Sequence, residues 1–114
     1  MKILCENALP AALNSKFGAV ILIGVNNQKE VLGHMFSARE EDDIHDIINQ
    51  IWNLIEPKEK EKEARKIVSF VPVKNEKEFS NMKRKVIRIT VIPYPGIDYY
   101  LKQYPENYQQ LEQR

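Results

Sequence analysis

The chain has 114 residues, of which 43% are hydrophobic and 29% are charged, and these proportions are typical of one soluble globular domain. Its 17 basic and 16 acidic residues leave a net charge of +1, which gives no general attraction to nucleic acids or anionic membranes. The single cysteine, Cys5, excludes an internal disulfide and four-ligand zinc clusters of the common kinds. With no signal peptide and no apolar run of about 20 residues, the sequence predicts a cytoplasmic protein, and signal-independent secretion into a host cell stays open.

The first predicted elements are a short helix and a strand. Residues 7–16 are expected to form the helix, with Asn7 as its cap and Pro10 in its first turn, where a missing N–H costs little. Residues 18–25 are almost continuously apolar and rich in Val and Ile. This pattern predicts a strand that is buried on both faces, near the centre of a sheet. Asn26-Asn27 then supplies a turn, since Asn tolerates a positive φ.

A returning strand and the most secure helix of the chain follow. Residues 31–36 are expected to return antiparallel to the preceding strand. Ser37 and Glu40 have the spacing of a capping box, and acidic residues crowd the first turn of the helix that this box begins. Pro57 marks its end. Apolar residues at helical spacing predict the face buried on the sheet: Ile44, Ile47, Ile48, Ile51, Trp52 and Ile55.

Two more strands are predicted in the second half of the chain. The alternating charges of residues 58–63 favour a solvated connector, with a partner-binding loop as the alternative. Residues 67–73 are expected to form the next strand, and Pro72 near its end indicates a sheet edge or the point where the chain leaves the sheet. A short helix is expected at 76–84, before a strand at 86–92 whose residues alternate between apolar and polar.

The predicted order is α-β-β-α-β-α-β, which indicates a single-domain α/β (α+β) sandwich over residues 1–96. Residues 97–114 are expected to form a helical tail rich in tyrosine. This tail either covers the sheet edge of its own domain or docks on a partner, and docking on a second copy would give a symmetric homodimer. Tyrosine is enriched where proteins meet, so the candidate partner-binding residues are Tyr94, Tyr99, Tyr100, Tyr104 and Tyr108.

Motifs for cofactors and metals are missing from the sequence. The four glycines stand alone, without a phosphate-binding loop, so no cofactor is expected. Asp42, Asp43 and Asp46 surround His45 at the start of the predicted isoleucine helix. A weakly held divalent cation would fit them, but helix capping explains these residues without a metal, and no metal site is predicted.

The segment Leu32-Gly33-His34-Met35-Phe36, followed by acidic residues and the isoleucine helix, resembles the chemoreceptor glutamine deamidase family. The resemblance extends over about residues 17–96, mainly in the order of the elements. It implies a thiolate nucleophile that attacks a glutamine carboxamide, with His34 as the base. The family places its cysteine just before the first strand, where this chain has Ser15 instead of a thiol, and Cys5 lies about ten residues earlier.

Two functional hypotheses follow from these residues. The preferred one is a small non-catalytic protein-binding protein, a homodimeric regulator, inhibitor or adaptor; one target in this class is a bacterial effector enzyme. The alternative is a cysteine-dependent glutamine deamidase or amidase that uses Cys5 and His34 as catalytic residues. Nucleic-acid binding is a distant third, because Lys83-Arg84-Lys85 and Arg88 have no aromatic platform on the same element.

Overall fold

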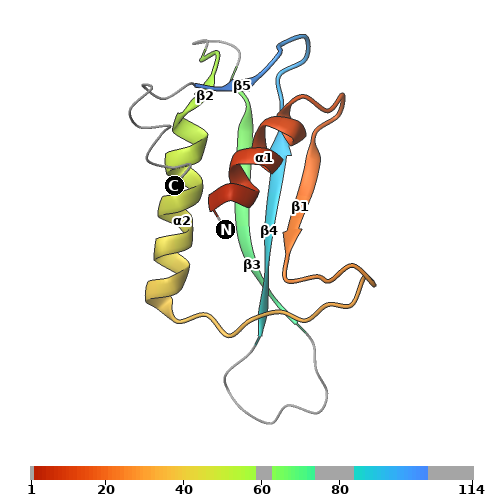
Figure 1. Ribbon diagram of the computed structural model, residues 1–114, viewed down its shortest axis with the longest axis vertical. Helices are drawn as coiled ribbons and strands as arrows, with labels where there is room; N and C mark the ends of the chain where they lie inside the picture. The colour runs from red at the N-terminus through yellow and green to blue at the C-terminus, as the bar shows by residue number, and fades with distance from the viewer. Residues whose placement is uncertain (1, 59–62, 74–83, 103–114) are drawn as a thin grey trace.

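A computed structural model describes residues 2–58, 63–73 and 84–102 (Figure 1). Within these residues, β1, β4 and β3 form an antiparallel sheet in that order, and β2 pairs separately with β5. Helices and antiparallel strands combine in one domain, so the predicted α+β class is confirmed. The elements in chain order are α1 (Lys2–Leu13), β1 (Ala19–Ile23), α2 (Ala38–Asn53), β2 (Ile55–Glu56), β3 (Arg65–Pro72), β4 (Lys85–Ile92) and β5 (Tyr100–Leu101).

β4 is the middle strand of the sheet, and its sequence alternates as predicted. Ile87, Ile89 and Val91 are buried on one face, whereas Arg88 on the other face is exposed. Directly opposite residues of antiparallel strands share a face, so the register extends the buried face into the neighbouring strands. The neighbours on that face are Ala19, Ile21, Ile23, Lys66, Val68 and Phe70.

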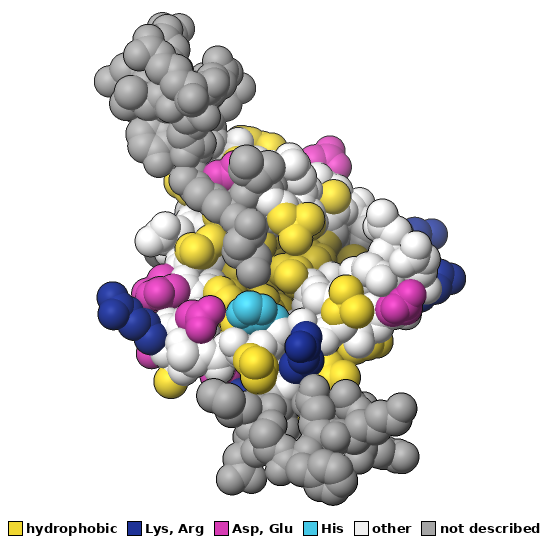
Figure 2. All heavy atoms as spheres, turned by 60° about the horizontal axis from the view of Figure 1, so that its bottom comes forward, with side chains coloured by type: hydrophobic (Ala, Val, Ile, Leu, Met, Phe, Trp, Pro, Cys, Tyr) yellow, Lys and Arg dark blue, Asp and Glu magenta, His cyan; other side chains and the backbone are white. Residues whose placement is uncertain are grey.

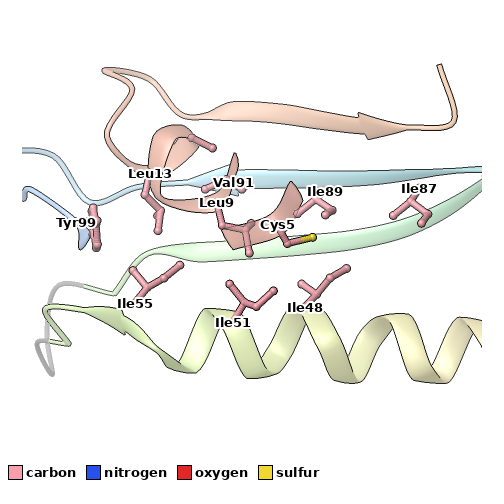
Figure 3. Packing of buried hydrophobic residues seen from close by; sticks show 11 residues of the cluster. Cys5, Leu9, Leu13, Ile48, Ile51, Ile55, Ile87, Ile89, Val91 and Tyr99 are labelled. Atoms are coloured by element: carbon pink, nitrogen blue, oxygen red, sulfur yellow. The ribbon is translucent and has the colours of Figure 1, made fainter. Parts of the chain in front are cut away.

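α2 begins and packs as its sequence predicts. The Ser37 side chain accepts a hydrogen bond from the Glu40 backbone N–H, and the Glu40 carboxylate accepts one from the Ser37 N–H, which completes the capping box. Ile48 and Ile51 are fully buried, and Figure 3 shows them pointing toward α1 and the sheet. Both helices therefore cover the same face of the sheet.

α1 is longer than the predicted helix and begins earlier, at Lys2 rather than after Asn7. Pro10 lies inside it, not in its first turn. Cys5, Leu9 and Leu13 recur at a spacing of four and are all buried in the core. This packing stabilises the helix across the proline, because tertiary burial contributes more to a short helix than residue propensity does.

β1 contradicts the prediction of a central strand. In the described part of the chain it pairs only with β4, so it lies at the edge of the sheet. Its residues alternate between partly buried and exposed, and Val20 and Leu22 face away from the helices. A run that is apolar on both faces predicts a strand that is buried on both faces, but here the second apolar face of β1 is exposed.

The expected return strand at 31–36 is reduced to isolated contacts. Val25 bridges Val31, and the Asn26 side chain accepts hydrogen bonds from the backbone N–H groups of Gln28 and Glu30, which closes the turn. β1 leaves the sheet after Ile23, opposite Ile87, and His34 then pairs with Lys85 through two backbone hydrogen bonds of 2.9 and 2.8 Å. The returning chain thus continues the pairing of β4 instead of forming a ladder with β1.

The predicted helical tail is not found over residues 97–102, where the chain is extended and forms β5. The Asn14 side chain holds this segment to the end of α1. Its Nδ2 donates to the Tyr99 carbonyl at 2.7 Å, and its Oδ1 accepts from the Tyr99 N–H at 2.6 Å. Tyr99 is buried in the core, so the start of the tail belongs to the domain.

Other expectations lie wholly or partly outside the described residues. Most of the charged run at 58–63, nearly all of the predicted helix at 76–84 and the last twelve residues of the tail are of this kind. Pro72 does lie at the end of an edge strand, because β3 pairs only with β4 among the strands described. No helix in the described ranges has the length and apolarity needed to cross a bilayer.

Candidate functional site

The two residues of the alternative catalytic hypothesis lie in different surroundings. Cys5 lies on α1, inside the hydrophobic core, with only 1% of its surface exposed. His34 lies on the segment between β1 and α2, and 62% of its side chain is exposed. A catalytic pair would need the thiol and the imidazole to share one accessible site, and the core position of Cys5 closes its sulfur off from a substrate.

Burial also opposes the ionisation that a nucleophilic cysteine requires. Desolvation by burial raises the pKa of the Cys5 thiol; the positive charge of the N-terminal amino group lowers it by less than that, and the negative charge of Glu6 adds a still smaller rise. The reactive form of cysteine is the thiolate, which low-pKa sites favour. Cys5 therefore has the properties of a structural core residue.

His34 contacts an acidic side chain and an aromatic ring at the surface. Its Nε2 lies 3.7 Å from Oε2 of Glu40, and its ring centroid lies 4.8 Å from that of Phe36. Figure 2 shows a histidine at the surface with hydrophobic side chains gathered above it and acidic side chains beside it. The hydrogen bonds from Ser37 lower the pKa of the Glu40 carboxyl, and His34 contributes to this lowering.

The aromatic contacts continue into the domain and explain why this segment is held in place. Phe36 packs edge-on against Phe70 of β3 at 5.3 Å, and His45 of α2 packs against the same ring at 5.3 Å. These four rings anchor the loop to both α2 and β3. No group of three or more His, Cys, Asp or Glu side chains suited to a metal ion occurs in the part of the chain that the structure describes.

The predicted partner-binding tyrosines do not form one surface. Tyr99 is buried, and its hydroxyl accepts a hydrogen bond from the Tyr94 backbone N–H at 3.2 Å. Tyr94 and Tyr100 are exposed. Tyr104 and Tyr108 lie outside the described residues. Tyr99 is therefore a core residue rather than a contact residue, because it belongs to the buried cluster that residues of α1, α2 and the sheet form.

A different surface carries the strongest signal for binding. We call it the open face: the side of the sheet opposite the one that α1 and α2 cover. It is formed by Val20, Leu22, Arg65, Ile67, Ser69, Arg88, Thr90 and Ile92, and it ends where Val71 lies opposite Val86, which is buried. All three strands place large apolar side chains on it, and the exposed fractions are 55% for Val20, 52% for Leu22, 55% for Ile67 and 46% for Ile92.

Charge on the open face is of one sign. Arg88 and Arg65 are both exposed and belong to neighbouring strands, β4 and β3. Thr90 and Ser69 add hydroxyl groups between the apolar side chains. An apolar surface with positive charge among its members suits a partner that combines apolar groups with carboxylates.

The basic triplet of the nucleic-acid hypothesis is only partly described, since Lys83 lies outside the described residues. The Nζ of Lys85 lies 3.2 Å from Oε1 of Glu41, so an acidic neighbour offsets its charge. Arg88 lies on the open face, where Leu22 and Ser69 flank it rather than aromatic rings. The arrangement does not strengthen this hypothesis.

Sequence reasoning missed the open face although a signal for it was present. Val20, Leu22 and Ile67 each interrupt the alternation of apolar and polar residues that a sheet with one solvent-exposed face should show. A strand with apolar residues on both faces either lies between two layers or offers its second face to a partner. The choice depends on how many layers the fold has, which the local pattern does not encode.

The Schlafen-like domain family of nematodes matches residues 4–102, which is most of the chain. No curated protein matches the chain. The resemblance to the chemoreceptor glutamine deamidases is therefore wrong. It depended on the order of the elements and on the Gly33-His34 dipeptide, and neither distinguishes one α+β family from another.

Proposed function

The chain belongs to the Schlafen-like domain family of nematodes, and within it we propose that this chain acts as a protein-binding domain whose open face contacts another protein. The observation that supports this proposal is the group of four aliphatic side chains that all three strands expose on that face. Monomeric proteins rarely expose large groups of apolar side chains, and such groups often mark interaction sites.

The geometry of the face suits docking. Val20 and Ile67 flank Thr90 in the register, and Leu22 lies directly opposite Arg88. The apolar groups therefore lie on all three strands around Thr90 and beside Arg88, so that apolar and polar side chains alternate across the face. Removing such side chains from water on binding is favourable by about 25 cal/mol for each Å² of apolar area.

The arginines define the kind of partner. Arg88 in the middle strand and Arg65 in an edge strand can each form a charge-assisted, bidentate hydrogen bond with a carboxylate. Electrostatic complementarity selects among partners and speeds their association more than it adds affinity. We therefore expect a partner surface with aliphatic groups and at least one Asp or Glu aligned with Arg88. A role as regulator, inhibitor or adaptor stays a prediction, as does a bacterial effector as its target.

Affinity capture with charge-substituted variants tests this proposal. Ile67→Lys places a charge on the open face at β3, and Leu4→Lys places one at an exposed leucine on α1. Proteins captured from a lysate of the source organism are quantified for the wild type and for both variants. A specific partner should fall at least roughly tenfold with Ile67→Lys, equivalent to about 1.4 kcal/mol, and should be retained with Leu4→Lys.

Charge reversal tests the predicted chemistry of the partner. Arg88→Glu should reduce capture and Arg88→Lys should keep part of it, whereas Arg39→Glu on the exposed surface of α2 should have no effect. Circular dichroism on each variant checks that the fold is intact. If folded Ile67→Lys and Arg88→Glu proteins capture the same partners as the wild type, the open face is not the binding surface.

A further inference from the structure

We infer that the outer edge of β1 pairs with the β1 strand of a second copy, antiparallel about a two-fold axis through Ile21. The pairing would join two sheets into one continuous sheet. The inference concerns the edge of the sheet, not its open face, so it does not require the proposed function to hold. Figure 1 shows β1 at the outer side of the sheet, with its partner β4 on the other side.

The two edges of the sheet differ in how well they are protected. Exposed strand edges invite pairing with other chains, and proteins commonly block them with charges or proline or cover them with another element. β3 has the first two of these devices. It carries Arg65, Lys66 and Pro72, and the Lys66 ammonium lies 5.6 Å from the Trp52 ring of α2, which ties this strand to the helix.

β1 has none of these devices. Its sequence, Ala19-Val-Ile-Leu-Ile23, contains no charge and no proline, and every residue has an aliphatic side chain. Val and Ile are also the residues that strands favour most. Among the described elements, β1 pairs with β4 alone, so one side of its backbone is available for a second strand. The contrast with β3 indicates that this edge is kept open for pairing.

A second copy is the partner that fits this strand best. Antiparallel pairing of a strand with itself follows a two-fold axis, which is the commonest symmetry of homodimers. With the axis through Ile21, Val20 lies opposite the partner's Leu22 and Ala19 lies opposite the partner's Ile23. All five residues are then paired, no charges oppose each other, and the apolar side chains of both copies meet across the joint.

The same register accounts for two exposed apolar residues at the ends of the strand. Phe17 is 87% exposed and precedes β1 by two residues. In this register it lies opposite the partner's Val25, which bridges Val31 in its own chain, and Val31 is 55% exposed. The pairing thus brings Phe17 of each copy to an apolar pair on the other.

Charges around the strand permit this contact. Lys16 would approach the partner's turn, which carries Lys29 and Glu30 and is neutral overall. By contrast, dimerisation through the open face would bring Arg65 and Arg88 of two copies together. The edge of β1 is therefore suited to a second copy, and the open face to a different protein.

Sedimentation equilibrium of the full chain tests the inference. The monomer has a mass of 13.4 kDa, and we expect a concentration-dependent shift toward twice that mass. Leu22→Lys places two like charges across the joint and should weaken the dimer at least roughly tenfold. Ile67→Lys, a matched change on β3, should leave the dimer intact.

The outcomes separate the two proposals. A monomer at every concentration overturns the inference and leaves the proposed function standing, because capture of another protein is measured independently. If Leu22→Lys and Ile67→Lys weaken the dimer equally, the copies meet through the open face, which overturns pairing through β1. If neither weakens it, another surface holds the dimer and the inference also fails.

Cross-linking tests the register without relying on a destabilising variant. In the Val20→Cys/Leu22→Cys protein each new thiol lies opposite the other one in the second copy, at a distance that a disulfide spans. Mild oxidation should give a covalent dimer. The control protein Ile67→Cys/Ser69→Cys carries the same pair on β3 and should form no covalent dimer. A control that cross-links as readily as the β1 variant overturns the inference.

Discussion

At the scale of single residues, burial decides the chemistry of Cys5. The thiol is enclosed by core side chains, and desolvation raises its pKa. A raised thiol pKa keeps the group protonated at neutral pH and therefore unreactive. The sequence marked Cys5 as interesting because it is the sole cysteine, but its neighbours at a spacing of four, Leu9 and Leu13, indicate a core position.

We predict that Cys5 of the native protein reacts with iodoacetamide at least roughly tenfold more slowly than in urea, because both access and ionisation are restricted. Mass spectrometry over time measures the two rates. His34→Ala should leave the native rate unchanged. A native rate equal to that in urea, or one that falls in His34→Ala, would mean that the thiol is activated.

The helix cap of α2 gives a second residue-scale prediction. Ser37→Ala removes the side chain that accepts from the Glu40 N–H, so it should lower the free energy of unfolding by about 1 kcal/mol. Ala38→Gly in the first turn serves as a comparison for helix propensity alone. Urea denaturation measures both. A loss for Ser37→Ala well below a few tenths of a kcal/mol would show that the cap contributes nothing.

The cap also predicts a pH dependence. The pKa of Glu40 is lowered in the folded chain, mainly by its hydrogen bond from the Ser37 backbone, so the unfolded chain binds this proton more tightly. The contribution of Glu40 to stability is thus present above the ordinary carboxyl pKa and is lost as the pH falls through the folded pKa. An NMR titration of the Glu40 side chain should show the lowered value, and a value at or above the ordinary one would contradict this account.

At the scale of elements, the glycine between α1 and β1 is required by its surroundings. Gly18 has a φ of +85°, and a Cβ there would lie 2.3 Å from the Val91 carbonyl oxygen. Gly96 has a similar φ of +81° but no heavy atom within 4 Å of such a Cβ. A comparison of substitutions at the two positions therefore separates the energetic cost of the left-handed backbone from the cost of the steric conflict with Val91.

We predict that Gly18→Ala destabilises the protein clearly more than Gly96→Ala. The left-handed conformation costs each alanine about 1–2 kcal/mol, and Gly18→Ala must in addition move β1 away from β4. Urea denaturation of both variants gives the comparison. Equal losses would show that the close approach of Gly18 to Val91 is relieved at no cost.

Asn14 also holds an element in place. Its side-chain amide makes the two hydrogen bonds that a neighbouring strand would otherwise make with the backbone of Tyr99, just before β5. Asn14→Ala would leave the N–H and the carbonyl of Tyr99 without this partner in a partly buried site. We expect a loss of about 1–3 kcal/mol and faster hydrogen exchange at Tyr100 and Leu101. Asn27→Ala in the exposed turn is the matched control. Unchanged exchange in Asn14→Ala would show that β2 alone holds the segment.

The elements also show what the sequence can and cannot specify. The capping box, the isoleucine face of α2 and the alternation of β4 are local patterns, and each is confirmed. The position of β1 at the sheet edge, the pairing of His34 with Lys85 and the burial of Tyr99 depend on contacts between distant segments. No pattern within one segment encodes those contacts, so the predictions of a central strand, of helix over residues 97–102 and of an exposed Tyr99 were wrong.

At the scale of the whole molecule, two helices on one side of the sheet leave the other side open. The inner residues of the strands pack against the helices, yet the outer positions of β1, β3 and β4 also carry four exposed aliphatic side chains. Between 46% and 55% of each of these residues stays exposed in the described chain. We propose that a binding role explains why they are apolar, and the open face is therefore the central claim.

Methyl NMR with the purified partner, once capture has identified it, tests that claim most directly. The chain is labelled at the methyl groups of Ile, Leu and Val, and the partner is added stepwise. We predict that the signals of Val20, Leu22, Ile67 and Ile92 shift or broaden, while those of Ile48 and Ile51 in the core stay in place. Changes confined to α2 or to the segment around His34, with the four methyl-bearing residues of the open face unaffected, would contradict the account.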